Sequence, residues 1–280
     1  MSAPPARMPA AETAAGPAVE FVDIAHGEGD GGRQRLEFAW VGATTSPLPP
    51  VVFLHEGLGS VSMWKDFPAR FCAAHGLRGL VYSRRGYGRS TPRAASERWG
   101  IDFMHVQADQ ALPHLLEALG IVRPWLFGHS DGASIALLHA ARHLSAGVIA
   151  VAPHVFVEDV AISSIEAARR AYEQGDLRQR LSRHHDDPES AFRGWNDAWL
   201  DPAFRAWNIE RDLASIACPV MAVQGEGDEY GTLDQIDAIA RRLPKTRLLA
   251  IADCGHSPHR DQPAVLVREA GRFILEHSVH

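Results

Sequence analysis

Three residue types that together perform acyl transfer occur in this chain in the order Ser130, Asp228 and His256. A serine hydroxyl becomes a nucleophile when an imidazole takes its proton, and a carboxylate then holds that imidazole in the required tautomer. In this scheme Ser130 attacks a carbonyl, His256 takes and later returns the proton, and Asp228 orients the histidine. The question is whether the fold brings the three side chains together.

The serine lies in the pentapeptide Gly-His-Ser-Asp-Gly at 128–132. The apolar run 125–127 precedes it, and a small-residue helical stretch, 133–141, follows it. Glycines on both sides leave room for a sharp strand-to-helix turn, which lifts the serine hydroxyl clear of the sheet and places the next amides at a helix N-terminus. Taken alone, the pentapeptide is equally compatible with a tight turn whose serine caps the helix.

The other two residues also follow predicted strands. Asp228 comes shortly after the apolar run 219–223, and His256 comes shortly after 247–251. Because the carboxyl ends of parallel strands meet at one edge of a sheet, these side chains are expected to converge on Ser130. Agreement in order and in context therefore favours catalysis over the capped turn.

Composition and charge exclude several classes of protein. The chain has 280 residues and a formal charge of -6, and no basic stretch offers a footprint for nucleic acid. No apolar run approaches the roughly 20 residues that cross a bilayer. The three cysteines, Cys72, Cys218 and Cys254, are widely spaced and fit a reducing compartment. Segment 1–18 lacks the features of a secretory signal, so we expect a disordered leader and a cytoplasmic protein.

Apolar strands alternate with helices over 19–155 and again over 217–280, which predicts a parallel sheet covered on both faces. Within the first part, 101–119 has the pattern of an amphipathic helix that Pro113 should kink or interrupt. The segment 156–216 has no apolar strand and is helical and charged. It is predicted to form a lid over the carboxyl ends of the strands. The alternative is an extra helical layer without a catalytic role.

Four segments resemble motifs of the α/β-hydrolase superfamily, in its capped, esterase-like branch of serine hydrolases. The pentapeptide 128–132 resembles the nucleophile elbow, 225–228 the acid loop and 255–258 the histidine loop. The segment 85–90 resembles the R-G-x-G-x-S stretch. The resemblance covers almost everything after residue 19. It implies a mostly parallel eight-stranded sheet flanked by helices, with a helical cap inserted after the sixth strand.

Asp228 has rivals for the role of the acid. Glu226 lies two residues earlier on the same loop, and Glu158 with Asp159 follows the sixth predicted strand. We favour Asp228 because it matches the G-x-x-D position of the family.

The oxyanion hole is expected to combine the amide of Asp131 with one from the loop 55–59. This loop resembles the family's His-Gly segment, and either Gly57 or Leu58 is the expected second donor.

The same loop carries Glu56 where the family usually has glycine. One hypothesis is that this carboxylate disfavours anionic substrates or pairs with Arg84 or Arg85. A solvated loop carboxylate is the alternative.

Aromatic residues late in the 156–216 segment predict an apolar acyl or alcohol pocket, although packing in the core is the more common role of such residues. Trp195 and Trp199 are four residues apart and share one helix face. His129 and His154 are further candidates for the pocket wall, and His259 is expected to orient the loop of His256. The aromatic residues concerned are Phe192, Trp195, Trp199, Phe204 and Trp207.

These features predict a serine hydrolase that cleaves a small carboxylic ester or thioester with an apolar or aromatic moiety, through an acyl-enzyme. We expect no metal, no cofactor, no nucleic-acid or membrane partner, and a monomer or homodimer. Alternatives on the same fold are a carbon–carbon bond hydrolase of aromatic ring-cleavage products, a lactonase, an aminopeptidase and a cofactor-free haloperoxidase. The serine argues against epoxide hydrolases and haloalkane dehalogenases, which need aspartate at that turn. A non-catalytic receptor is least favoured, because it needs no proton relay.

Overall fold

A computed structural model describes residues 18–25 and 32–278. The leader expected over 1–18 therefore lies outside the described residues except for its last position. The glycine-rich segment 27–32, from which the sequence predicts a hairpin turn, also lies outside them except for Gly32.

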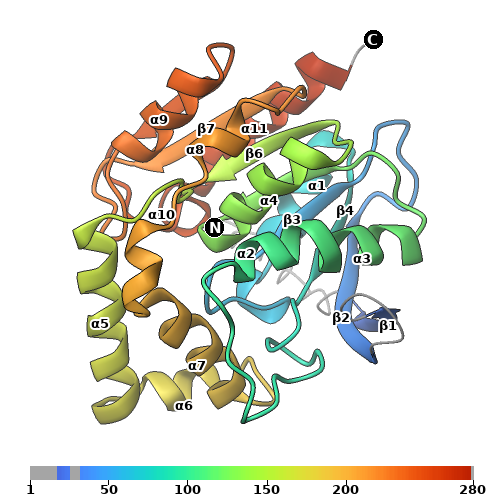
Figure 1. Ribbon diagram of the computed structural model, residues 1–280. Helices are drawn as coiled ribbons and strands as arrows, with labels where there is room; N and C mark the ends of the chain where they lie inside the picture. The colour runs from blue at the N-terminus through green and yellow to red at the C-terminus, as the bar shows by residue number, and fades with distance from the viewer. Residues whose placement is uncertain (1–17, 26–31, 279–280) are drawn as a thin grey trace, which may run out of the picture.

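An eight-stranded sheet forms the centre of the molecule (Figure 1). Its strand order is β1-β2-β4-β3-β5-β6-β7-β8. The pairings of β1 with β2 and of β2 with β4 are antiparallel, and all the others are parallel. The predicted mostly parallel eight-stranded sheet is thus confirmed. The strands are β1 (Glu20–Ala25), β2 (Arg33–Gly42), β3 (Val51–Leu54), β4 (Arg78–Tyr82), β5 (Trp125–His129), β6 (Gly147–Val151), β7 (Val220–Gly225) and β8 (Arg247–Ile251).

Helices cover both faces of the sheet (Figure 1). Successive residues of β3 divide between the two sides: Val52 and Leu54 belong to one apolar core, and Val51 and Phe53 to the other. This alternation follows from the period of two along a strand, and it explains why central strands are apolar throughout. One face carries α1 (Phe67–His75) and α11 (Pro263–Ser278), and the other carries α3 (Leu112–Ala118), α4 (Asp131–Arg142) and α9 (Asp234–Arg242).

The helix expected over 101–119 changes its winding along its length. It begins as α2 (Phe103–Val106), passes through a π-helical turn at Gln107–Ala111 and continues as α3. Pro113 is near the start of α3. A proline cannot donate to the carbonyl one turn earlier, and its ring collides with that carbonyl in a regular helix. The wider π turn just before it accommodates this conflict.

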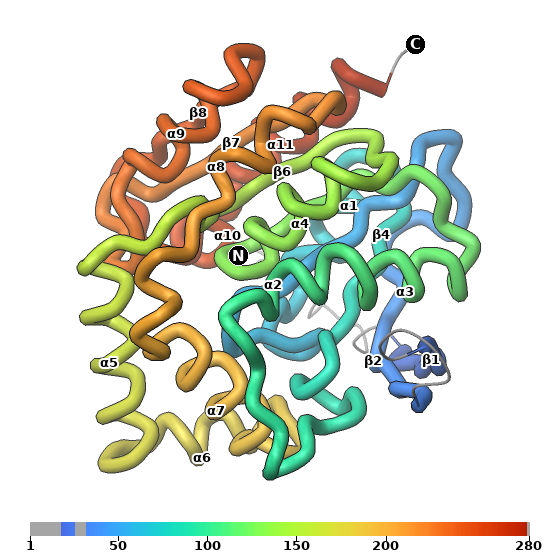
Figure 2. The backbone as a smooth tube through the Cα atoms, in the orientation of Figure 1, coloured from blue at the N-terminus to red at the C-terminus, as the bar shows by residue number. Residues whose placement is uncertain are grey.

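The segment between β6 and β7 is helical. Its helices α5, α6 and α7 lie together to one side of the sheet, at the lower left of Figures 1 and 2. The two ends of the segment meet, because Phe156 forms a bridge with Asn208 and the Ile209 amide donates to the Val155 carbonyl at 2.8 Å. The helical excursion thus starts and returns beside the carboxyl end of β6, and α8 then precedes β7. The segment contains α5 (Asp159–Gln174), α6 (Leu177–Leu181), α7 (Pro188–Trp199), a 3-10 turn (Pro202–Ala206) and α8 (Glu210–Leu213).

Candidate active site

Ser130, His256 and Asp228 form one hydrogen-bonded series at the carboxyl edge of the sheet. The Ser130 hydroxyl lies 2.9 Å from His256 Nε2. On the other side of the ring, Nδ1 lies 2.9 Å from both carboxylate oxygens of Asp228. Because Nδ1 must donate to the carboxylate, Nε2 carries a lone pair that accepts the serine proton. The three residues come from the turns after β5, β8 and β7.

The backbone at Ser130 is held in an uncommon conformation, with φ +53° and ψ -122°. The flanking glycines allow this turn. A side chain at Gly128 would collide with the carbonyl of Gly132, and one at Gly132 would collide with the carbonyl of Leu54. The next helix, α4, begins at Asp131, so its first amides have no partner within the helix. The turn therefore presents both a hydroxyl and free N–H groups at one point.

Asp228 is fixed by groups other than the histidine. The Tyr230 amide donates to Oδ1 at 2.8 Å, and the side chain of Gln224 donates to Oδ2 at 2.5 Å. Burial pushes the pKa of Asp228 up, but the hydrogen bond with His256 and its charge outweigh burial, so the pKa lies below its usual value. The carboxylate is thus charged and oriented at neutral pH.

The rival acids lie elsewhere. Glu226 is exposed, and Asp159 pairs with Arg205 on the outside of the helical segment. Glu158 accepts hydrogen bonds from Thr232 instead. The geometry therefore favours Asp228.

The loop 55–59 has its carbonyl groups turned toward the protein interior. The buried guanidinium of Arg84 donates to the carbonyls of His55 and Glu56, the latter at 3.0 Å. His185 Nε2 donates to the carbonyl of Leu58 at 3.0 Å. Neither Arg84 nor His185 was assigned this role from the sequence. The tight turn at 84–90 could have indicated Arg84, whereas nothing around His185 marks it.

Gly57 and Leu58 both line the cavity above Ser130, and within the described ranges neither amide donates to a backbone carbonyl. Gly57 is required for space, since a side chain there would collide with the indole of Trp195. The residues expected to supply the oxyanion donors, Asp131 included, thus line the same cavity.

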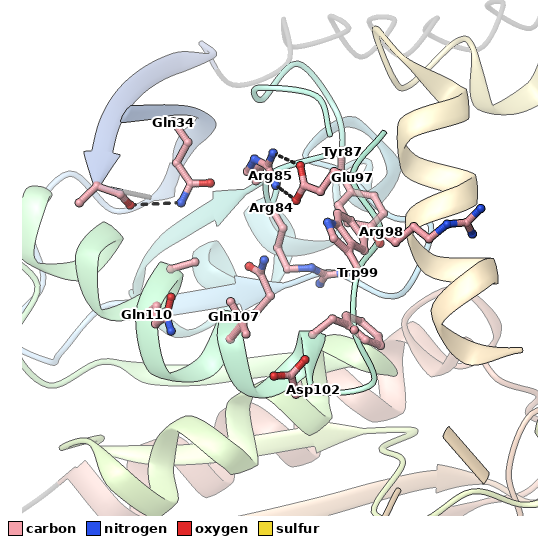
Figure 3. A pocket seen from close by; sticks show the side chains of 15 residues that line it. Gln34, Arg84, Arg85, Tyr87, Glu97, Arg98, Trp99, Asp102, Gln107 and Gln110 are labelled. Carbon is pink, nitrogen blue, oxygen red and sulfur yellow. Dashed lines mark hydrogen bonds and ion pairs between the residues drawn. The ribbon is translucent and has the colours of Figure 1, made fainter. Parts of the chain in front are cut away.

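The predicted pairing of Glu56 with Arg84 or Arg85 is wrong. Arg85 forms a two-pronged contact with Glu97, one bond of which measures 2.6 Å (Figure 3). Arg84 lies beside the Tyr87 ring, with its guanidinium carbon 4.9 Å from the ring centroid, and binds main-chain carbonyls. Both arginines thus bind groups other than the Glu56 carboxylate.

Glu56 instead faces His129 and Arg260. Its Oε2 lies 3.6 Å from His129 Nδ1, and its Oε1 lies 3.8 Å from the guanidinium of Arg260. Burial pushes the pKa of Glu56 up, but the neighbouring His129 holds it well below its usual value. Only about a fifth of the side chain is exposed (19%), so it is not a solvated loop carboxylate.

A cavity of about 430 Å³ lies over Ser130. Trp195 and Trp199 of α7 form part of its wall, and Trp199 also donates to Asp131 Oδ1 at 3.1 Å. Trp207 is not among the lining residues. It lies after the end of α7 and stacks on Phe204, with ring centroids 5.3 Å apart. The lining residues are Glu56, Gly57, Leu58, His129, Ser130, Asp131, His154, Ile165, Arg180, Trp195, Trp199, Glu229, Tyr230, His256, Ser257 and Arg260.

Burial shifts the pKa of several ionisable groups around the cavity in the direction that favours the neutral form. Burial lowers the pKa of His154 to about 3 and that of His259 to about 2. Burial raises the pKa of Asp131 to about 6. His259 packs against His129, with ring centroids 4.8 Å apart.

Two residues next to Asp228 also contact His256 and were not assigned from the sequence. Glu229 Oε2 accepts a hydrogen bond from the His256 amide at 3.1 Å. The Tyr230 ring lies 4.6 Å from the imidazole, centroid to centroid. Their position directly after the acid was the available signal. Three consecutive residues thus contact His256, with Asp228 and Tyr230 at its ring and Glu229 at its main-chain amide.

Two features are absent from the described residues. They contain no group of three or more histidine, cysteine, aspartate or glutamate residues arranged to hold a metal ion. None of their helices is long and apolar enough to cross a membrane.

The family model described as the alpha/beta hydrolase family matches residues 51–270. The chain therefore belongs to the alpha/beta hydrolase family, as its motifs indicated.

Its relatives carry different activities in their names. The chain is 27% identical over 252 residues to a 2-succinyl-6-hydroxy-2,4-cyclohexadiene-1-carboxylate synthase of Enterobacter sp. (strain 638), a match covering 78% of this chain and 89% of the relative. It is 28% identical over 216 residues to a bifunctional esterase/perhydrolase of Acinetobacter calcoaceticus, covering 64% and 75%. A thermophilic esterase from Thermogutta terrifontis has the same fold, with a TM-score of 0.69 and 20% identity over 93% of this chain and all of that one (100%).

Proposed function

We propose that the protein is a serine hydrolase that cleaves a small carboxylic ester or thioester through an acyl-enzyme. The observation that carries the proposal is the unbroken series from Asp228 through His256 to the Ser130 hydroxyl, with each contact at 2.9 Å. A purely structural turn needs neither the series nor the uncommon backbone conformation at its serine.

In the first half of the reaction the Ser130 oxygen attacks the carbonyl carbon while its proton passes to His256 Nε2. The carbonyl oxygen becomes an anion, and the amide of Asp131 with that of Gly57 or Leu58 donates to it. His256 then protonates the departing alkoxide or thiolate, which leaves Ser130 acylated.

In the second half His256 takes a proton from water, and the hydroxide attacks the acyl carbonyl. The tetrahedral intermediate collapses, Ser130 regains its proton from His256, and the carboxylic acid departs. Asp228 stays charged throughout and stabilises the imidazolium that forms twice in the cycle.

The cavity supports a substrate of modest size with an apolar or aromatic moiety. A volume of about 430 Å³ is at the small end of ligand pockets, and the indoles of Trp195 and Trp199 offer flat apolar walls. We propose that the helical segment 156–216 acts as the lid over this cavity. The name of the Acinetobacter relative, an esterase/perhydrolase, agrees with ester cleavage.

The test combines active-site labelling with a substrate panel. A fluorophosphonate probe should label the folded protein, and peptide mapping should place the label on Ser130. Aryl acetate, butyrate and phenylacetate esters and their thioesters should be hydrolysed, with an acyl-enzyme trapped by rapid quenching. Folded protein that takes no label on Ser130 would overturn the proposal.

A further inference from the structure

The imidazole of His129 lies between three loops of the candidate site. It directly precedes Ser130, and its side chain is only 2% exposed. Its Nε2 donates to the main-chain carbonyl of His256 at 2.7 Å. Its Nδ1 lies 3.6 Å from the carboxylate of Glu56, which belongs to the loop 55–59. One ring therefore touches the histidine loop and the oxyanion loop while standing beside the nucleophile.

The contacts of this ring fix its orientation. A carbonyl oxygen only accepts, so Nε2 is the nitrogen that donates to the His256 carbonyl. Nδ1 is thereby turned toward the carboxylate of Glu56, 3.6 Å away. Burial works against the charge of Glu56, yet the interaction with His129 keeps the pKa of Glu56 well below its usual value.

The other charged and titratable groups near the pair do not replace either partner. His259 packs on the His129 ring, but its own pKa of about 2 leaves it neutral. His55 is buried, and burial lowers its pKa as well. Arg260 approaches Glu56 only at the rim, at 3.8 Å, and is largely exposed. His129 is thus the buried partner of the carboxylate.

The main chain and the side chain of Glu56 are both held in place, and together they restrain the rest of the loop 55–59. Its carbonyl is fixed by Arg84 at 3.0 Å, and its carboxylate folds back over Gly59, where any side chain would collide with it. The amides of Gly57 and Leu58 lie between these two fixed points. A displacement of the Glu56 side chain therefore moves Gly57 and Leu58, which line the cavity with Ser130.

We propose that Glu56 and His129 form a positioning pair that ties the oxyanion loop to the loop of His256, so that nucleophile, base and oxyanion donors keep one relative geometry through both halves of the reaction. This proposal rests on the proposed hydrolase function. It assigns Glu56 a role in alignment instead of a role in selecting substrates by charge.

Four variants test it: Glu56→Gln, His129→Gln, His129→Leu and the double variant Glu56→Gln/His129→Leu. A loss of alignment lowers kcat more than it changes KM. We expect His129→Leu to reduce kcat by about 10- to 100-fold, the size of effect that misplacement by about 1 Å produces. His129→Gln keeps an N–H that reaches the His256 carbonyl, so this variant should retain most of the wild-type kcat. The double variant should be no slower than His129→Leu, because each change breaks the same link.

Thermal unfolding by circular dichroism identifies the folded variants. Should His129→Leu not fold, the two near-isosteric amide variants decide. A wild-type kcat in Glu56→Gln overturns the proposed pair. The pair is also overturned if the fold-reduction of kcat in the double variant equals the product of the reductions in Glu56→Gln and His129→Leu. Ser130→Ala separates the two proposals. Hydrolysis that survives in Ser130→Ala overturns the hydrolase mechanism, whereas loss in Ser130→Ala with wild-type kcat in His129→Leu overturns only the pair.

Discussion

The carboxyl edge of the sheet and the helical segment between β6 and β7 both face the cavity, but they contact it by different means. At the sheet edge the reacting groups are held by hydrogen bonds at defined atoms, such as the 2.9 Å contacts on either side of His256. The helical segment brings aromatic rings to the cavity wall, such as that of Trp199, which packs on Phe204 with centroids 4.8 Å apart.

This difference separates reactivity from substrate selection. Proton transfer and oxyanion binding depend on distance and direction within about half an ångström, whereas apolar contact is non-directional and scales with buried area. We therefore expect changes at the sheet edge to lower kcat, and changes in the helical segment to alter KM and substrate preference. Four predictions test that division.

Replacing the nucleophile should have the largest effect. Ser130→Ala removes the attacking oxygen, and we expect kcat/KM to fall by at least about 10⁴-fold, with little change in the unfolding temperature. Ester hydrolysis and fluorophosphonate labelling measure this. Ser182→Ala, which alters an exposed serine of the helical segment, is the control and should retain both activities. Label on another serine in Ser130→Ala would contradict the assignment.

Gly57 is the point where the two regions touch, and Gly57→Ala should reduce kcat by about 10²- to 10³-fold, the effect of losing an oxyanion donor. The added methyl group collides with the Trp195 indole, so the loop must move. Combining it with Trp195→Ala removes the obstacle and should restore much of kcat while KM rises. If Gly57→Ala alone is as fast as the wild type, the loop does not supply a donor.

Asp131 also connects the sheet edge with the helical segment, since it follows Ser130 and its carboxylate accepts a hydrogen bond from the Trp199 indole. Burial raises its pKa from 3.8 to about 6, so the folded protein holds more protons than the unfolded chain between these values. The contribution of Asp131 should therefore lower the free energy of unfolding by about 3 kcal/mol in total as pH rises through both pKa values, with about 2 kcal/mol of the fall between pH 4 and pH 6.

Asp131→Asn has no titrating carboxyl group at this position. The difference in free energy of unfolding between the wild type and this variant should therefore show the pH dependence of Asp131 alone. Urea unfolding from pH 4 to pH 8 measures it, and subtraction cancels the histidines common to both proteins. A difference that does not depend on pH would contradict the buried, titrating carboxylate.

The smallest effect is expected in the wall of the cavity. Trp199→Phe keeps a ring but loses the N–H that binds Asp131, and KM should rise by about 3- to 10-fold with kcat nearly unchanged. Steady-state kinetics on the aryl ester panel measures this. Trp207→Phe is the matched control, because Trp207 stacks on Phe204 away from the cavity and should alter stability alone. An equal change in KM for both variants would remove the distinction between wall and core.

The sequence by itself determined the sheet and the order of the reacting residues. Buried parallel strands are apolar throughout, so β3 and β5 to β7 were recognisable from their composition. Ser130 was recognisable because its turn needs glycines within a few residues of it. These signals are local along the chain, and the convergence of strand ends then follows from parallel topology alone.

Only the tertiary structure decided which distant groups meet. Glu56 faces His129 instead of an arginine, and His185 reaches the Leu58 carbonyl from 127 residues away. Trp207 and Trp199 have similar surroundings in the sequence, yet one lies in the core and the other in the cavity wall. The physical reason is that side-chain pairing depends on how helices and loops pack in three dimensions, and residue type and local periodicity carry no record of that packing.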